Sequence, residues 1–287
     1  MTARHGLSGA SRRGGGQWGQ RATDTGLMLW YLAVIAFLFA PIVAAMIYSF
    51  NLGVVNKQTA ALTGWTLQWY PAAWNDLSLR RSVQASLVVS FWSAVLSIVI
   101  GSALGYVIVR HPSDRVRRFL AALTYILLIV PESVIGVSLL LFYAVTRFPL
   151  GTATLVAGIT PMAIAVVALV VRARVLTLDR QVEEAAADLG STRLKTLWFI
   201  ILPQVAPAVA AGGVMAYTFS LDNLVVSSFL TTPRITTLPV YLYGSLQYGP
   251  SPAVYAAASV VFIFTMLMLG LAAMLYRLTR RPAVAPR

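Results

Sequence analysis

Residues 183–203 read EEAAADLGSTRLKTLWFIILP and lie between two long apolar runs. Their acidic start and three alanines favour a short helix, because acids stabilise the first turn of a helix and alanine has the highest helix propensity. Gly190 stands where this helix should end, since glycine adopts the left-handed conformation of a helix end without a steric cost. The stretch therefore predicts a short helix, a sharp turn and a second helix that starts at Ser191 or Thr192 and runs to Pro203.

The chain around this stretch has the composition of a membrane protein. It contains 287 residues, of which 58% are hydrophobic and 11% are charged. A bilayer core about 30 Å thick requires about 20 apolar residues in each helix that crosses it. The apolar runs lack the alternation that barrel strands show, so the predicted fold class is an all-α membrane protein. Six runs are long enough to be transmembrane helices: 27–50, 82–109, 119–145, 150–171, 206–230 and 253–276.

The basic residues predict the orientation of these helices. The net charge is +13, and 17 of the 22 Lys and Arg residues fall in segments that are cytoplasmic if the N-terminus is inside. The positive-inside rule therefore places both termini in the cytoplasm. This topology accounts for the charge, so no nucleic-acid partner is predicted. The predicted division is a flexible basic tail at 1–26, a transmembrane domain at 27–278 with a cytoplasmic loop at 172–205, and a second cytoplasmic tail at 279–287.

The longest predicted outer loop, residues 51–81, carries several aromatic side chains. Tryptophan and tyrosine favour the membrane interface, where one part of the ring meets lipid and another meets water. Anchoring in membrane lipid is the predicted role, and a ligand platform is the alternative. The aromatic residues are Trp65, Trp69, Tyr70 and Trp74.

Two acidic residues fall inside predicted spans, where a carboxylate at the bilayer centre costs about 2.5 to 3.5 kcal/mol on insertion scales. Glu132 lies near the middle of the third span, directly after Pro131, which predicts a kink. Asp222 lies 19 residues beyond Pro203, which is about 28 Å along a helix and near the outer mouth. Glu132 either faces a polar pathway or satisfies backbone donors freed at the bend, and the residues alone leave both roles open.

The 172–205 loop resembles the conserved loop of permease subunits from ATP-binding cassette (ABC) importers, whose motif is E-A-A-x-x-x-G-x9-I-x-L-P. All marker positions match: Glu184, Ala185, Ala186, Gly190 and Pro203. Six spans with both ends inside also resemble this family, so the similarity covers residues 27–276. The resemblance implies that the short helix docks into a cytoplasmic ATPase through these marker residues. An amphipathic linker at the membrane surface is the alternative role for the loop.

The same resemblance predicts the partners. The chain has no G-x-x-x-x-G-K-[ST] motif for holding a nucleotide, so it is predicted not to be an enzyme and to bind no cofactor or metal itself. ATP and Mg would be used by cytoplasmic ABC ATPase subunits. The family also implies a second homologous permease subunit, an extracytoplasmic solute-binding protein and a location in the bacterial inner membrane.

Two further blocks, residues 130–143 and 220–259, resemble spermidine/putrescine permeases, which makes a polyamine the predicted solute. Those relatives usually carry S-x-D-D, where this chain has Asn223 as the second residue of the acidic pair. Ala253 and Tyr255 also replace a later Glu and Asn of the family pattern. An opine, an amino-acid derivative, or a metal or anion complex is the alternative solute. The predicted solute-pathway residues are Glu132, Asp222 and Asn223.

Two other functional classes are open to a chain of this composition. An ion-coupled secondary carrier would contain internal repeats and several intramembrane ionisable residues. A membrane enzyme would need a cluster of His, Asp or Glu side chains. The chain shows only two acids within its predicted spans, and its two histidines, His5 and His111, lie apart in predicted cytoplasmic segments.

Overall fold

The computed structural model describes residues 16–54, 61–247, 249 and 251–279. Within these residues the secondary structure consists of helices and two isolated β-bridges, which confirms the predicted helical class. The chain divides into two compact units. One combines the described residues up to Pro71 with those beyond residue 250, and the other comprises Ala72–Gly249.

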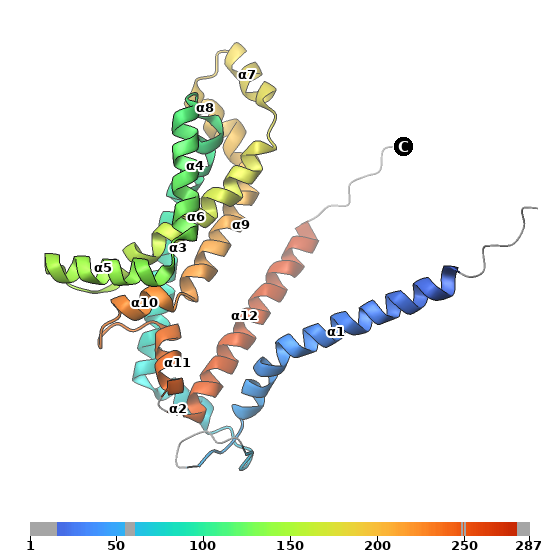
Figure 1. Ribbon diagram of the computed structural model, residues 1–287, viewed down its shortest axis with the longest axis vertical. Helices are drawn as coiled ribbons and strands as arrows, with labels where there is room; N and C mark the ends of the chain where they lie inside the picture. The colour runs from blue at the N-terminus through green and yellow to red at the C-terminus, as the bar shows by residue number, and fades with distance from the viewer. Residues whose placement is uncertain (1–15, 55–60, 248, 250, 280–287) are drawn as a thin grey trace, which may run out of the picture. The chain divides into compact units, whose positions relative to one another are not determined.

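The first unit contains two long helices from opposite ends of the chain, drawn in blue and red in Figure 1. Tyr48 at the end of α1 and Tyr255 near the start of α12 bring their ring centroids within 6.2 Å of each other. This aromatic contact joins the ends of the two helices. The bounds are α1 Gly16–Tyr48 and α12 Pro252–Thr279.

The helix α1 begins before the predicted first span. The sequence assigns residues 16–26 to a flexible tail, whereas the structure continues the helix through them. Extending a formed helix adds one hydrogen bond for each residue fixed, so a polar flank without proline can prolong an apolar helix. The remaining parts of the predicted tails, 1–15 and 280–287, lie outside the described residues.

The loop after α1 is organised around Asn51. Its side-chain oxygen accepts a hydrogen bond from the backbone N–H of Thr63 at 2.7 Å, and its carbonyl accepts one from the indole N–H of Trp69 at 2.9 Å. Trp69 is therefore buried, which corrects its predicted role as a membrane anchor. Trp65 and Trp74 are each 72% exposed, as anchoring requires. A buried indole needs a partner for its N–H, and Asn51 supplies that partner.

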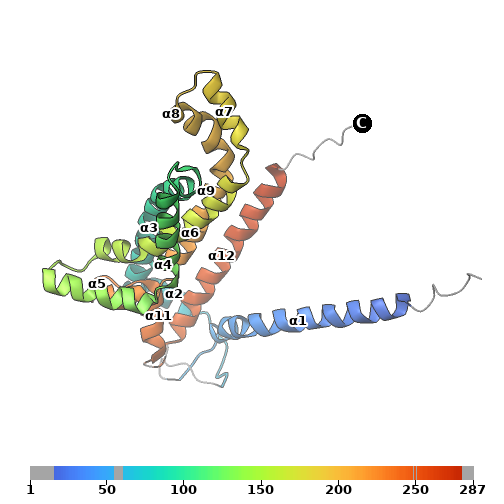
Figure 2. The same ribbon diagram turned by 45° about the horizontal axis from the view of Figure 1, so that its top comes forward.

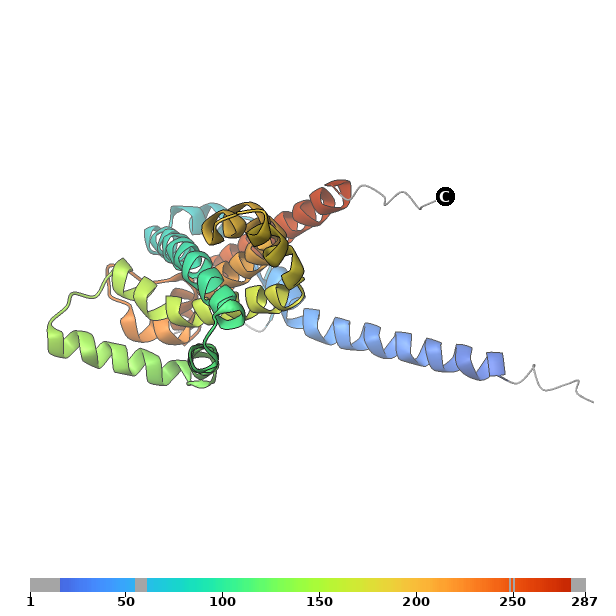
Figure 3. The same cartoon turned by 90° about the horizontal axis from the view of Figure 1, so that it is seen from above.

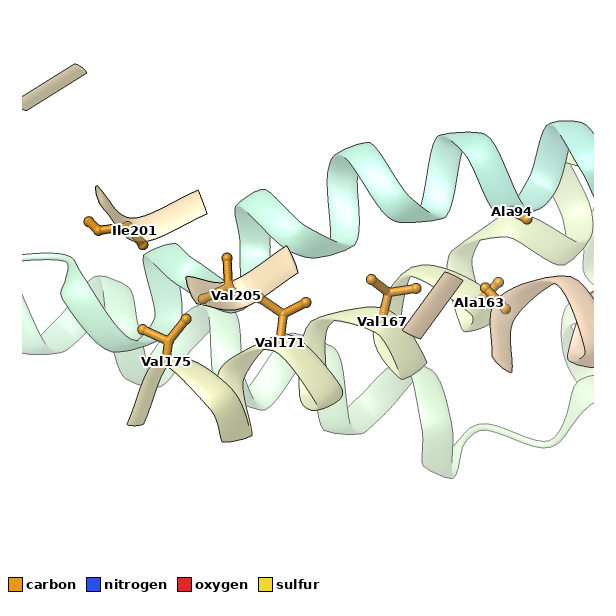
Figure 4. Close-up of a cluster of buried hydrophobic side chains, with 8 residues drawn as sticks. Ala94, Ala163, Val167, Val171, Val175, Ile201 and Val205 are labelled. Carbon is orange, nitrogen blue, oxygen red and sulfur yellow. The ribbon is translucent and has the colours of Figure 1, made fainter. Parts of the chain in front are cut away.

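The second unit is built on three long helices that lie side by side, as Figure 1 shows. Figure 4 shows the centre of their core, where valines of α6 pack with residues of α3 and α9. The labelled core residues are Ala94, Ala163, Val167, Val171, Val175, Ile201 and Val205. The bounds are α3 Leu77–Arg110, α6 Thr152–Leu176 and α9 Leu202–Leu221.

One face of α3 carries a buried serine at every third or fourth position. Small residues at this spacing allow neighbouring helices in a membrane to approach closely. Ser93 accepts hydrogen bonds from the hydroxyl of Ser220 in α9 at 2.9 Å and from that of Thr160 in α6 at 3.3 Å. A single hydroxyl thus connects all three helices. The buried serines are Ser82, Ser86, Ser90, Ser93 and Ser97.

The predicted third span, 119–145, is not one helix. It breaks into α4 (Asp114–Ile129) and α5 (Glu132–Thr146), which lie at 94° to each other. Figure 3 looks along α4, so that α5 lies across the view. The break follows from Pro131, because a proline excludes the helical conformation from the residue before it, and Val130 is extended. Glu132 consequently lies in the first turn of α5, directly after the break.

The predicted fifth span, 206–230, also ends early. The helix α9 stops at Leu221, and a short helix, α10 (Val225–Leu230), follows after a break. Asn223 accepts a hydrogen bond from the backbone N–H of Ser227 at 3.2 Å. This side chain satisfies one of the free N–H groups at the start of α10 and so favours a new helix over continuation of α9.

The start of α3 is tied to α11 (Leu238–Gln247) by one carboxylate. Asp76 caps α3 by accepting from the backbone N–H groups of Ser78 and Leu79, and its second oxygen accepts from the Tyr241 hydroxyl at 3.0 Å. Burial, followed by the hydrogen bond to Asp76 and its negative charge, raises the pKa of Tyr241 to about 12. The phenol therefore remains a hydrogen-bond donor at neutral pH.

Among the described residues, four helical stretches are long and apolar enough to cross a membrane, and the bent pair α4 and α5 would make a fifth. The sixth predicted span, 253–276, coincides with α12, in which the apolar stretch with described side chains is the shorter Pro252–Ile263. Six spans therefore remain a prediction. The four stretches are Gly26–Tyr48, Leu77–Arg110, Thr152–Leu176 and Arg193–Leu221.

Candidate functional site

The EAA loop, residues 177–203, forms one end of the second unit. Figures 1 and 2 both place its helix α7 at the opposite end of the bundle from α10 and α11. The loop is shorter than the predicted 172–205, because α6 continues to Leu176 through residues that include no glycine or proline. Its elements are α7 (Arg180–Asp188), α8 (Arg193–Thr196) and the π-helix η1 (Leu197–Ile201).

The helix α7 starts and ends through local hydrogen bonds. Asp179 accepts from the backbone N–H of Gln181 at 2.9 Å and caps the first turn. At the other end Gly190 has a φ of 81° and donates its N–H to Ala187, while Ser191 donates to Ala186. These two bonds are those of a Schellman motif, in which the left-handed residue satisfies the last carbonyls of a helix. The predicted helix end at Gly190 is confirmed.

The second helix of the loop starts at Thr192, as predicted, because its hydroxyl accepts from the backbone N–H of Lys195 at 3.4 Å. It does not end at Pro203. The chain continues from α8 through η1 into α9 without a break, and the N–H of Leu202 reaches back five residues to the carbonyl of Leu197. Pro203 has no N–H to donate, so the regular helical hydrogen bond is missing there. The five-residue bonds of the π-helix lie directly before this position.

A groove of about 530 Å³ opens between α7 and η1. Its walls are mainly apolar, and Leu189 at its edge is 89% exposed. Beyond it, the side chains of Trp198 and Phe199 are 59% and 79% exposed. The loop thus exposes several large apolar side chains among its charged residues. The lining residues are Asp179, Gln181, Val182, Ala185, Ala186, Leu189, Ser191 and Ile200.

The structure separates the five predicted docking residues by exposure. Glu184, Ala185, Gly190 and Pro203 are exposed, whereas Ala186 is buried. Glu184 makes no hydrogen bond or ion pair with any described residue, so its carboxylate is available to another molecule. Ala186 serves the interior packing of the loop, and only part of the motif faces outward.

The neighbouring acid, Glu183, is paired and largely buried, unlike Glu184. Its carboxylate accepts from the Nε of Arg110 at 2.8 Å, and the Nη2 of the same arginine donates to the carbonyl of Leu178 at 3.1 Å. The two charged side chains are only 11% and 21% exposed. The sequence predicts neither contact, since Arg110 lies 73 residues away along the chain.

The structure brings together two of the three predicted pathway residues. Asn223, which is buried, donates its side-chain amide to a carboxylate oxygen of Glu132 at 3.1 Å. Of the two roles that the sequence leaves open for Glu132, the contact with backbone donors at the bend is not formed with any described residue. Asp222 lies apart as the exposed C-cap residue of α9, and its backbone N–H donates to Thr218.

Within the described part of the chain, no three His, Asp or Glu side chains come together as metal ligands. His111 accepts through Nδ1 from the backbone N–H of Ser113 and so stabilises the turn between α3 and α4. The role of His111 in this structure is thus to stabilise a turn through a local side-chain hydrogen bond to the backbone.

Residues 97–281 match the family described as binding-protein-dependent transport system inner membrane component. This chain belongs to that family. The permease is 33% identical over 231 residues to the putrescine transport system permease protein PotI of Escherichia coli, covering 78% of this chain and 81% of the relative. It is also 33% identical over 238 residues to the spermidine/putrescine transport system permease protein PotC of Escherichia coli, covering 82% and 88%.

A solved structure shows the same fold. A chain of a bacterial alginate ABC transporter, in complex with an alginate-bound periplasmic protein, superposes on the permease with a TM-score of 0.68. The match covers 93% of the permease and 96% of the other chain, at 15% identity. Identity this low indicates a shared fold only.

The permease is therefore a multi-pass inner-membrane subunit of an ABC importer. Its relatives are transport permeases and not ATPases. This assignment replaces the alternatives of an ion-coupled carrier and a membrane enzyme. It also confirms the family that the EAA loop indicates.

Proposed function

We propose that the permease forms half of a membrane pathway for a polyamine such as putrescine or spermidine. Support comes from the two relatives named for these solutes, which align with about four fifths of the chain. A polyamine carries several ammonium groups, and a protein recognises such groups through carboxylates and aromatic faces. The acidic residues of the second unit are therefore candidates for contact with the solute.

Glu132 is suited to this role. One of its oxygens accepts from Asn223, and the other makes no hydrogen bond with a described residue. A partly buried carboxylate with a free oxygen attracts an ammonium group and repels an anion, and a low local dielectric strengthens both effects. This single contact supports a cationic solute over the anion complexes that the sequence leaves open. Asp222, exposed beside Asn223, adds negative charge in the same segment.

The EAA loop is proposed as the docking site for a cytoplasmic ABC ATPase, which would use ATP and Mg. The groove between α7 and η1, the free carboxylate of Glu184 and the exposed apolar side chain of Leu189 support this role. An apolar depression with charged side chains on the surface around it has the composition of a protein interface. Docking would involve Glu184, Ala185, Gly190 and Pro203 through their exposed surfaces and Ala186 through the wall of the groove.

The rest of the assembly follows from the family. We propose six spans within residues 27–278, both termini in the cytoplasm, a second homologous permease subunit and an extracytoplasmic solute-binding protein. The periplasmic protein in the alginate transporter structure supports the last of these. ATP-driven uptake of radiolabelled putrescine by the reconstituted assembly, with and without excess spermidine, tests the whole proposal. Competition by molybdate in place of spermidine would contradict a polyamine solute.

We expect Glu132→Gln to lower putrescine uptake about tenfold, because a hydrogen bond to a charged group contributes about 1.5 kcal/mol or more. The amide keeps the size of the side chain and one acceptor for Asn223 but loses the charge. Initial uptake rates at several putrescine concentrations measure the effect. Asp114→Asn, at the exposed start of α4, is the matched control and should leave uptake unchanged. Equal rates for both variants would remove Glu132 from the solute route.

A further inference from the structure

One guanidinium group holds the start of α7 at two points. Arg110, the last residue of α3, donates to Glu183 in the first turn of α7 and to the carbonyl of Leu178 just before that helix. A positive charge near a helix N-terminus is unfavourable by itself, and the Glu183 carboxylate compensates for it. Both side chains are largely buried, and a buried ion pair is held in one geometry by its hydrogen bonds.

The other end of this contact lies on a closely packed helix. Gly105, one turn and a half before Arg110, lies so close to α6 that a Cβ atom on it would be 2.6 Å from the carbonyl oxygen of Ala168. A Cβ atom on Gly101 would be 2.7 Å from the side chain of Val167. The backbones of α3 and α6 are therefore closely packed over this stretch.

The EAA loop is joined to the bundle by the peptide chain, by Ile201 in the apolar core and by Arg110. The peptide chain joins it to α6 at Thr177 and to α9 at Leu202, and Arg110 joins it to α3. The α6 connection is a short turn, Thr177–Asp179, which by itself would let α7 tilt. The two bonds of Arg110 hold this turn at Leu178 and the first turn of α7 at Glu183.

We propose that Arg110 and Glu183 are positioning residues that fix the angle of α7 to the bundle, so that movement of α7 is carried into α3. The inference rests on the proposed docking of α7 to an ATPase. The paired acids of the sequence then have separate roles, with Glu184 facing the ATPase and Glu183 facing the permease. Loss of the Arg110 contact leaves α7 able to dock but loosely joined to the transmembrane helices.

The test compares hydrolysis with transport in proteoliposomes that contain the permease, its ATPase, its second permease subunit and its solute-binding protein. We expect Arg110→Ala and Glu183→Gln to lower putrescine uptake about tenfold, which is a usual size for coupling between two sites. The rate of ATP hydrolysis should change less than about twofold. Arg110→Lys should be intermediate, because a lysine keeps the charge but lacks the planar fork that reaches two acceptors. Arg115→Ala, an exposed arginine near the start of α4, is the control and should change neither rate.

A second measurement needs no transport. The chain has no cysteine, so spin labels at Asp188→Cys and Arg115→Cys report the distance between α7 and the body of the permease. Arg110→Ala should broaden this distance distribution, and Arg110→Lys should broaden it less. Parallel loss of uptake and hydrolysis, together with an unchanged distribution, would overturn the proposal. A wild-type assembly that imports no putrescine would overturn the proposed function, while the spin-label distances would still decide whether Arg110 positions α7.

Discussion

Gly190→Val is expected to lower ATP-driven uptake about thirtyfold while the permease still inserts into the membrane. Gly190 has a φ of 81°, and a side chain in this left-handed conformation costs about 1 to 2 kcal/mol, with the largest cost for a β-branched residue. No atom lies within 4 Å of the position of a new Cβ atom, so the effect comes from the backbone and not from a clash. The Schellman turn must then open, which changes the angle between α7 and α8.

Gly190→Asn is the control for this experiment, because asparagine tolerates the left-handed conformation better than other residues with a Cβ atom. The amount of permease in the membrane fraction, putrescine uptake and ATPase stimulation are measured for both variants. Gly190→Asn should retain most of the uptake, and both variants should insert to the same extent. Full transport by Gly190→Val would show that the shape of this turn does not matter for coupling.

Gly105→Ala should lower the thermal stability of the permease in detergent by about 5 °C. The new methyl group would lie 2.6 Å from the carbonyl oxygen of Ala168 and 3.1 Å from the backbone N of Arg172. These are backbone atoms that cannot move aside, so α3 and α6 must separate, and overpacking of this kind costs about 1 to 3 kcal/mol. For a chain of this size each kcal/mol corresponds to about 2 to 4 °C. The fraction of monodisperse protein left after heating measures the change.

Gly244→Ala is the matched control, since Gly244 lies in α11 with no atom within 4 Å of a new Cβ atom. Alanine has the higher helix propensity by about 1 kcal/mol, so this variant should be as stable as the wild type or slightly more stable. The same propensity gain acts at Gly105, and the difference between the two variants therefore isolates the close contact of α3 with α6. Equal stability of the two variants would contradict that contact.

Local chemistry explains why much of the EAA loop is predictable from the sequence. The end of α7 depends on Gly190 and the start of α8 on Thr192, and each acts on backbone groups within a few residues. The positions of the long apolar helices follow from composition in the same way. The family assignment rests on these local features and is borne out by the relatives.

Local residues also cause the breaks in the predicted spans, but they do not determine how far the chain turns at each break. Pro131 predicts a kink, and the observed change of direction is 94°. Asp222 and Asn223 interrupt an apolar run, and the run ends because Asn223 finds Ser227 and Glu132 as partners. Hydropathy shows that a segment is apolar but does not show whether the segment is one straight helix or two helices joined by a bend. Hydropathy alone therefore overestimates the length of these helices.

Residue types and their spacing predicted membrane helices and a loop with a short helix, a glycine turn and a second helix, because those features depend on neighbours a few residues apart. The resemblance of this loop to that of ABC importer permeases supplied the family. Folding in three dimensions decided that Glu183 turns inward to Arg110 while Glu184 stays free, and that Glu132 meets Asn223. These contacts join residues 73 and 91 positions apart. Their formation depends on the close packing of α3, α6 and α9, which no local pattern encodes.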